Sequence, residues 1–143
     1  MRITDLLKKE SIDLNGVVTT KKETIEKMTL LMEQGGNVKD LEKYRAGVFA
    51  REEEGTTGIG EGIAIPHAKT DAVSGPGLAA MIIRDGVDYD SLDGEPVHMV
   101  FLIAAPNTED NINLEVRVAA MNNKISIPIW KKTNLTIDEA AAH

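Results

Sequence analysis

The segment TTGIGEGIAIPHAK, residues 56–69, separates a helical first half of the chain from a strand-rich second half. Three glycines stand at alternate positions, isoleucines continue the alternation, and Pro66 and His67 follow. Alternation of this kind predicts an extended segment, and glycine within it permits close backbone approach or a bend. Pro66 restricts its own φ and the residue before it. We therefore predict an extended, closely packed segment that presents a histidine at its end.

Two helices are predicted before this segment. Thr20 and Glu23 form a capping-box pattern ahead of apolar residues at helical spacing, and glycines 35 and 36 end that pattern. A second helical pattern ends at Gly55. On or beside one face it carries Leu41, Tyr44, Val48 and Arg51.

Two short apolar runs, residues 77–84 and 97–105, follow the glycine-rich segment and predict buried strands. Asp-Gly turn signals between them predict a short edge strand. Residues 107–121 have helical spacing, and residues 125–130 resemble an edge strand that contains a proline. This order predicts an α/β fold, with a mixed parallel and antiparallel sheet covered by helices.

Composition excludes several classes of function. The 143 residues contain no cysteine, which removes thiol nucleophiles and thiolate metal sites and fits a cytoplasmic protein. A net charge of −7 argues against a nucleic-acid surface, which requires clustered basic residues. No apolar run reaches the roughly 20 residues of a membrane span. Charges near the N-terminus do not fit a signal peptide.

His67 is the first candidate for chemistry, against the alternative of a buried structural histidine. Glu61 lies six residues earlier, so the two side chains share a face if the segment is extended throughout. Arg51 ends the preceding helix pattern within a short loop of the same region. An imidazole, a carboxylate that fixes its tautomer and a guanidinium that holds anionic oxygens are suited to accepting a phosphoryl group.

Other sites are not predicted. The glycine pattern is neither the dinucleotide fingerprint nor a phosphate-binding P-loop. His67 and His98 are far apart in sequence, and no histidine pair has metal-ligand spacing, so neither a metal nor a cofactor is expected. No nucleophile-elbow sequence supports a serine hydrolase. His98, inside an apolar strand, is interpreted as structural or surface-facing.

The sequence REEEGTTGIGEGIAIPHAK (residues 51–69), with ITDLL (3–7) and FLIAAPNTEDN (101–111), resembles the fructose/mannitol class of IIA components of the bacterial phosphoenolpyruvate-dependent sugar phosphotransferase system. The resemblance covers about residues 3–116. It implies that His67 is phosphorylated by the carrier HPr and passes the group to a cysteine of a IIB domain. Arg51 and Glu61 fall on polar positions around that histidine. The implied fold is an α/β sandwich, with a mixed sheet of about five strands flanked by helices.

Two departures from the family pattern accompany the resemblance. Asn113 stands where the family commonly has a second histidine; asparagine can donate a hydrogen bond to a phosphoryl oxygen but cannot become cationic. Residues 117–143 diverge from the family. We expect a single domain over residues 1–143, working in the cytoplasm with IIB and membrane IIC partners, with fructose as the favoured sugar. The alternatives are a phosphorylation-dependent regulatory module without a transported sugar, and a degenerate domain that no longer transfers phosphate.

Overall fold

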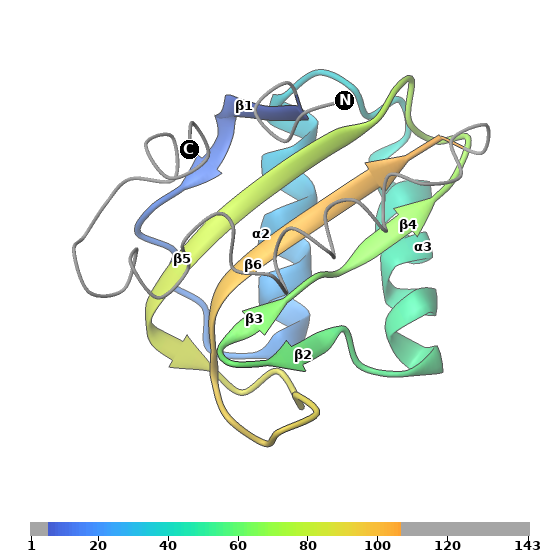
Figure 1. The fold of residues 1–143 in the computed structure, drawn as a ribbon. Helices are drawn as coiled ribbons and strands as arrows, with labels where there is room; N and C mark the ends of the chain where they lie inside the picture. Colours follow the sequence, from blue (N-terminus) through green and yellow to red (C-terminus); the bar gives the residue numbers. More distant parts are fainter. Residues whose placement is uncertain (1–5, 107–143) are drawn as a thin grey trace.

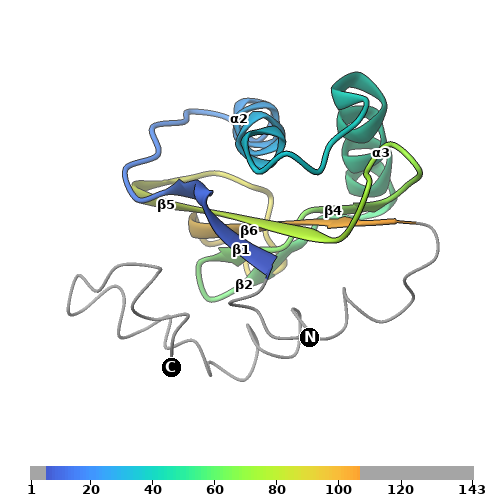
Figure 2. The ribbon, with the colours of Figure 1, turned by 90° about the horizontal axis from the view of Figure 1, so that it is seen from above.

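The computed structural model describes residues 6–106, which form a twisted β-sheet with two helices on one of its faces (Figures 1 and 2). Viewed from above in Figure 2, helices α2 (Lys21–Gln34) and α3 (Leu41–Glu54) lie side by side over the sheet. The elements are β1 (Leu7–Asp13), α2 (Lys21–Gln34), α3 (Leu41–Glu54), β2 (Gly58–Gly60), β3 (Ile63–Ala64), β4 (His67–Lys69), β5 (Gly77–Val87) and β6 (Val97–Ala105).

The sheet has the order β1-β5-β6-β3-β2, and β4 also pairs with β6. Strands β5 and β6 form the central antiparallel pair. Strand β1 runs parallel to β5, whereas β3 and β4 both run parallel to β6 at successive positions along it. The prediction of a mixed sheet of about five strands with flanking helices is confirmed, with β3 and β4 sharing one position in the strand order.

Local capping signals place both helices as predicted. The Thr20 side chain accepts a hydrogen bond from the Glu23 N–H at 3.0 Å, and the Glu23 carboxylate accepts one from the Thr19 N–H at 2.8 Å. This is the reciprocal arrangement that a capping box provides, displaced by one residue on the carboxylate side. Helix α3 begins after Asp40, whose carboxylate accepts from the Lys43 N–H at 3.1 Å.

Three strand predictions need correction. The glycine-rich segment is not one extended strand: it reverses between β2 and β3 at Glu61 and Gly62, whose φ angles are 57° and 80°. Two positive φ angles are what a tight hairpin turn requires. Strand β5 continues to Val87, and residues 88–96 form a loop in place of the predicted edge strand.

Strand β1 had not been predicted. Its sequence LKKESID carries four charged residues, so it lacks the apolar alternation of a half-buried strand. It forms because it pairs with β5 at the sheet edge while burying little more than Leu7 and Ser11. The predicted helix at residues 107–121 and strand at 125–130 lie outside the described residues.

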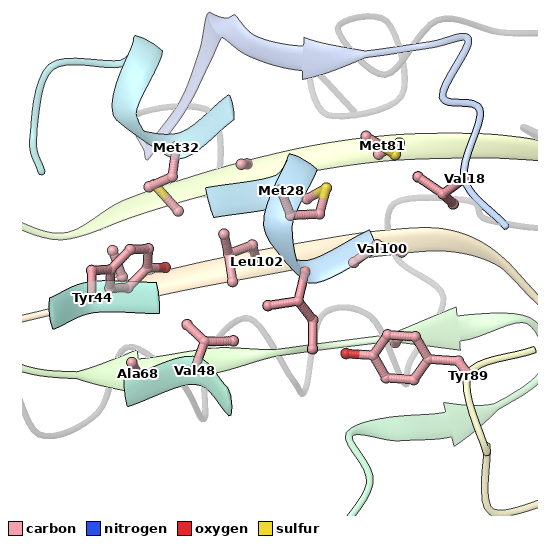
Figure 3. Packing of buried hydrophobic residues seen from close by; sticks show 14 of the residues in the cluster. Val18, Met28, Met32, Tyr44, Val48, Ala68, Met81, Tyr89, Val100 and Leu102 are labelled. Atoms are coloured by element: carbon pink, nitrogen blue, oxygen red, sulfur yellow. The ribbon is translucent and has the colours of Figure 1, made fainter. Parts of the chain in front are cut away.

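Alternate residues of the central strands divide the core between the two faces of the sheet. Val100 and Leu102 of β6 pack with the helices, together with Met28 of α2 and Val48 of α3 (Figure 3). Ala104 of β6 belongs to the same cluster. The intervening β6 side chains form a second buried cluster on the opposite face: Met99, Phe101, Ile103 and Ala105. Within residues 6–106, no helix is long and apolar enough to cross a membrane.

Candidate active site

His67 begins β4 and lies beside the central strand β6. It is in register with Ile103, and the Ile103 N–H donates to the Pro66 carbonyl at 3.0 Å. Its neighbour Ala68 belongs to the helix-side core, whereas Ile103 belongs to the cluster on the other face. Side chains alternate along a strand, so the imidazole lies on the face opposite the two helices, and His67 is 8% exposed.

A backbone carbonyl determines which nitrogen of His67 carries the proton. Nδ1 lies 2.9 Å from the carbonyl oxygen of Ile65. Because a carbonyl only accepts, Nδ1 must donate. In the neutral ring the lone pair then remains on Nε2, and Nε2 becomes the nucleophilic atom. The bond fixes the tautomer, the role that a carboxylate was expected to play.

Arg51 lies in the last turn of α3. Its Nη1 donates to the carbonyl oxygen of Gly55 at 2.8 Å, a hydrogen bond that closes the helix end. Its side chain is partly buried. No hydrogen bond within residues 6–106 joins Arg51 to His67, so the structure places the guanidinium at the start of the glycine-rich segment.

The structure does not bring Glu61 onto the strand face of His67. Glu61 is exposed in the β2–β3 turn, and its N–H donates to the Asp93 carboxylate at 2.9 Å. Strand β3 pairs with β6 at Met99, four residues before the position that pairs with His67. That offset corresponds to roughly 13 Å along the strand. The condition for a shared face, an extended path throughout, is not met because the chain reverses at Glu61.

The remaining predicted positions are placed as follows. His98 is half-buried, and its Nδ1 lies 3.0 Å from the carbonyl oxygen of Ile83, in keeping with a structural role. Asn113 lies outside the described residues. Across residues 6–106, no group of three potential ligands is arranged to hold a metal ion.

The sequence patterns did not indicate a buried polar cluster at the end of α3. The Glu52 carboxylate contacts Lys21 Nζ at 2.8 Å and accepts hydrogen bonds from the Tyr89 hydroxyl at 3.0 Å, the Thr57 N–H at 3.2 Å and the Thr57 hydroxyl. Desolvation, and secondarily the Glu52 charge, raise the pKa of the Tyr89 hydroxyl well above its usual value. Glu52 lies in an acidic run at the end of α3, yet it follows Val48 by four residues, the spacing that places it on the buried helix face.

Three comparisons relate the chain to known proteins. The family model described as "Phosphoenolpyruvate-dependent sugar phosphotransferase system, EIIA 2" matches residues 5–124. The fructose-specific EIIABC component of Bacillus subtilis is 46% identical over 115 residues, which is 80% of this chain and only 18% of the Bacillus protein.

Two solved structures of IIA proteins resemble the fold of this chain. The nitrogen regulatory protein IIA-Ntr from Neisseria meningitidis matches with a TM-score of 0.81 and 30% identity, over 98% of this chain and 97% of that chain. IIA-mannitol of Escherichia coli, in its complex with phosphorylated IIB-mannitol, matches with a TM-score of 0.78 and 26% identity, over 96% and 99%. With the matched family model covering most of its length, this chain belongs to the IIA family of the phosphoenolpyruvate-dependent sugar phosphotransferase system.

Proposed function

We propose that this chain is a phosphocarrier that accepts a phosphoryl group on Nε2 of His67 from phosphohistidine on HPr and passes it to a cysteine of a IIB component. The observation that carries the proposal is the 2.9 Å contact between His67 Nδ1 and the Ile65 carbonyl. It leaves the Nε2 lone pair as the nucleophile without any change of protonation before attack.

The transfer mainly requires that the donor imidazole and the ring of His67 are correctly positioned. The Nε2 lone pair of His67 forms the new N–P bond while the N–P bond of the donor breaks, and the donor imidazole keeps that electron pair. Each ring retains the proton on its other nitrogen. The ring of His67 becomes cationic as the bond forms, and the Ile65 carbonyl at Nδ1 stabilises this charge. Positioning and charge stabilisation are the main contributions a protein makes to such steps.

Arg51, Glu61 and Asn113 remain predictions of the family resemblance. Arg51 is proposed to bind the phosphoryl oxygens. To do so, its guanidinium would give up the hydrogen bond to the Gly55 carbonyl. Asn113 is proposed to donate to the same oxygens in place of a histidine. Glu61, on the exposed β2–β3 turn, is more suited to contact a partner than to orient the imidazole.

The relatives support part of this set of partners. An Escherichia coli IIA chain of the same fold is known in complex with its phosphorylated IIB, which supports a IIB acceptor here. The fructose-specific Bacillus relative supports fructose as the sugar and a membrane IIC component downstream. In this proposal residues 1–143 act as one IIA-type domain on the cytoplasmic side of the membrane.

A regulatory module is the second candidate, because the IIA-Ntr structure of Neisseria meningitidis matches with a TM-score of 0.81. His67 would be phosphorylated in both cases. The candidates differ in whether the phosphoryl group moves on to a IIB cysteine.

The test is phosphorylation by phosphoenolpyruvate, enzyme I and HPr, with the intact mass as readout, on the wild type, His67→Ala and the matched control His98→Ala. We expect one acid-labile, base-stable phosphoryl group on the wild type and on His98→Ala, and none on His67→Ala. An unmodified wild type, or a modified His67→Ala, would contradict the proposal. A fructose-type IIB is then added to the phosphorylated chain. Transfer of the phosphoryl group to the IIB cysteine indicates transport, and retention on His67 indicates regulation.

A further inference from the structure

Glu52 is a carboxylate held inside the protein at the end of α3, with a side chain only 5% exposed. A buried charge is costly unless it is paired and fully hydrogen-bonded. Here Lys21 neutralises it at 2.8 Å, and Thr57 and Tyr89 supply the hydrogen bonds. The Lys21 ammonium also lies 4.7 Å from the centre of the Tyr89 ring. A charged group kept buried in this way specifies the geometry of the groups around it.

The group that Glu52 fixes most completely is Thr57. One carboxylate oxygen accepts from the Thr57 N–H at 3.2 Å, and the other accepts from the Thr57 hydroxyl. Main chain and side chain of the same residue are thus bound by one carboxylate. Thr57 is 4% exposed, so water does not compete for these bonds.

Thr57 in turn holds Ile65, the residue whose carbonyl contacts the imidazole. The Ile65 N–H donates to the Thr57 carbonyl oxygen at 3.0 Å. The Ile65 carbonyl then accepts from His67 Nδ1 at 2.9 Å. Hydrogen bonds therefore run without interruption from Glu52 through Thr57 and Ile65 to the ring nitrogen of His67.

We propose that Glu52 is a positioning residue for the phosphoryl transfer, which orients the Ile65 carbonyl through Thr57 and so holds His67 in the Nδ1–H tautomer. This inference rests on the proposed function of His67. Glu52 does not touch the phosphoryl group. Its effect is to keep the acceptor at Nδ1 fixed while the ring becomes cationic during N–P bond formation.

Glu52 and Tyr89 come from elements far apart in sequence, and the β5–β6 loop reaches the cluster through the Tyr89 hydroxyl. Figure 3 shows Tyr89 at the edge of the helix-side core, with its hydroxyl directed toward the core interior. Loss of the Glu52 charge leaves Thr57 with weaker partners, so the connection between β3 and β4 that carries Ile65 gains freedom to tilt.

The experiment uses the full chain with histidine rings labelled with ¹⁵N, in wild type, Glu52→Gln, Thr57→Val and the matched control Glu53→Gln. Glu53 is exposed on the same helix end. Ring ¹⁵N shifts report the tautomer of unphosphorylated His67, a quantity that a purely structural role of Glu52 in a folded protein would leave unchanged. Phosphoryl acceptance from phospho-HPr is measured at varied donor concentration.

We expect Glu52→Gln and Thr57→Val to shift neutral His67 toward the Nε2–H tautomer. We also expect both to lower the maximal rate of acceptance about tenfold, the equivalent of one hydrogen bond of ordinary strength, with little change in the KM for the donor. Glu53→Gln should match the wild type. Thr57→Val preserves shape and the main-chain contact, so it tests the connection even if Glu52→Gln does not fold.

Folded variants with the wild-type tautomer and rate would overturn the proposal. A wild type that HPr does not phosphorylate would refute the proposed function instead, while the tautomer measurement still decides whether Glu52 orients His67. The two failures are therefore distinguishable.

Discussion

Nδ1 of His67 lies 2.9 Å from the carbonyl oxygen of Ile65, two residues earlier in the chain. A peptide carbonyl has no titratable proton, so this acceptor stays the same at every pH at which the protein is folded. A carboxylate in the same place would no longer hold the Nδ1–H tautomer once the carboxylate became protonated. The active tautomer of His67 is thus coupled to the backbone just before β4.

The isomer of phosphohistidine follows from that contact. We expect the phosphoryl group on Nε2, because Nδ1 is committed to the Ile65 carbonyl. Ring ¹⁵N and ³¹P spectra of the phosphorylated chain distinguish the two isomers. Phosphorylation on Nδ1 would show that the contact breaks before transfer.

Close packing of the glycine-rich segment makes Gly58→Ala destabilising. A Cβ at Gly58 would lie 2.5 Å from Ser91 Oγ and 2.9 Å from Ser91 Cα, so the β5–β6 loop would have to move. We expect a loss of about 1–3 kcal/mol in the free energy of unfolding, measured by urea denaturation. Gly75→Ala is the matched control, since nothing lies within 4 Å of a Cβ there. Equal stability of the two variants would refute this packing argument.

Arg51→Ala tests whether the guanidinium acts in transfer. If Arg51 leaves the Gly55 carbonyl for the phosphoryl oxygens, its loss should slow acceptance by about 10- to 100-fold without abolishing it, the scale of a hydrogen bond to a charged group. Rapid-quench measurement of the rate checks this, with exposed Arg84→Ala as the control. An unchanged rate would assign Arg51 to closing the helix end alone.

Asp93 links pH to the conformation of the β2–β3 turn. Hydrogen bonds from the N–H groups of Glu61 and Glu95 lower the pKa of the Asp93 carboxyl below its ordinary value of 3.8. Because the folded pKa is the lower one, the stabilisation is complete above the unfolded pKa and is lost as pH falls through the folded pKa. The Glu61 amide signal should therefore shift in an acid titration below pH 3.8, and Asp93→Asn should remove the shift. A transition at or above 3.8 would contradict this prediction.

The elements that were predicted correctly depend on neighbours in sequence. Thr20 and Glu23 cap α2 within one turn, and the apolar run 97–105 becomes the central strand β6. The β2–β3 reversal was missed because Glu61 adopts a positive φ while its N–H binds Asp93, 32 residues further along the chain. Glu52 was missed because a carboxylate in an acidic run is ordinarily solvated, and its three partner residues come from three other segments.

Local sequence patterns identify the groups that are available: a proline-preceded histidine, two helices, two apolar strands and the motif of the IIA family. The contacts of His67 depend on how the folded chain packs around it. The hydrogen bonds from Ile65 to Thr57 and from Ile103 to Pro66 hold the peptide units on either side of the one whose carbonyl accepts from Nδ1. The Ile103–Pro66 pairing joins segments far apart in sequence, and its geometry comes from the packing of the whole sheet rather than from any local pattern.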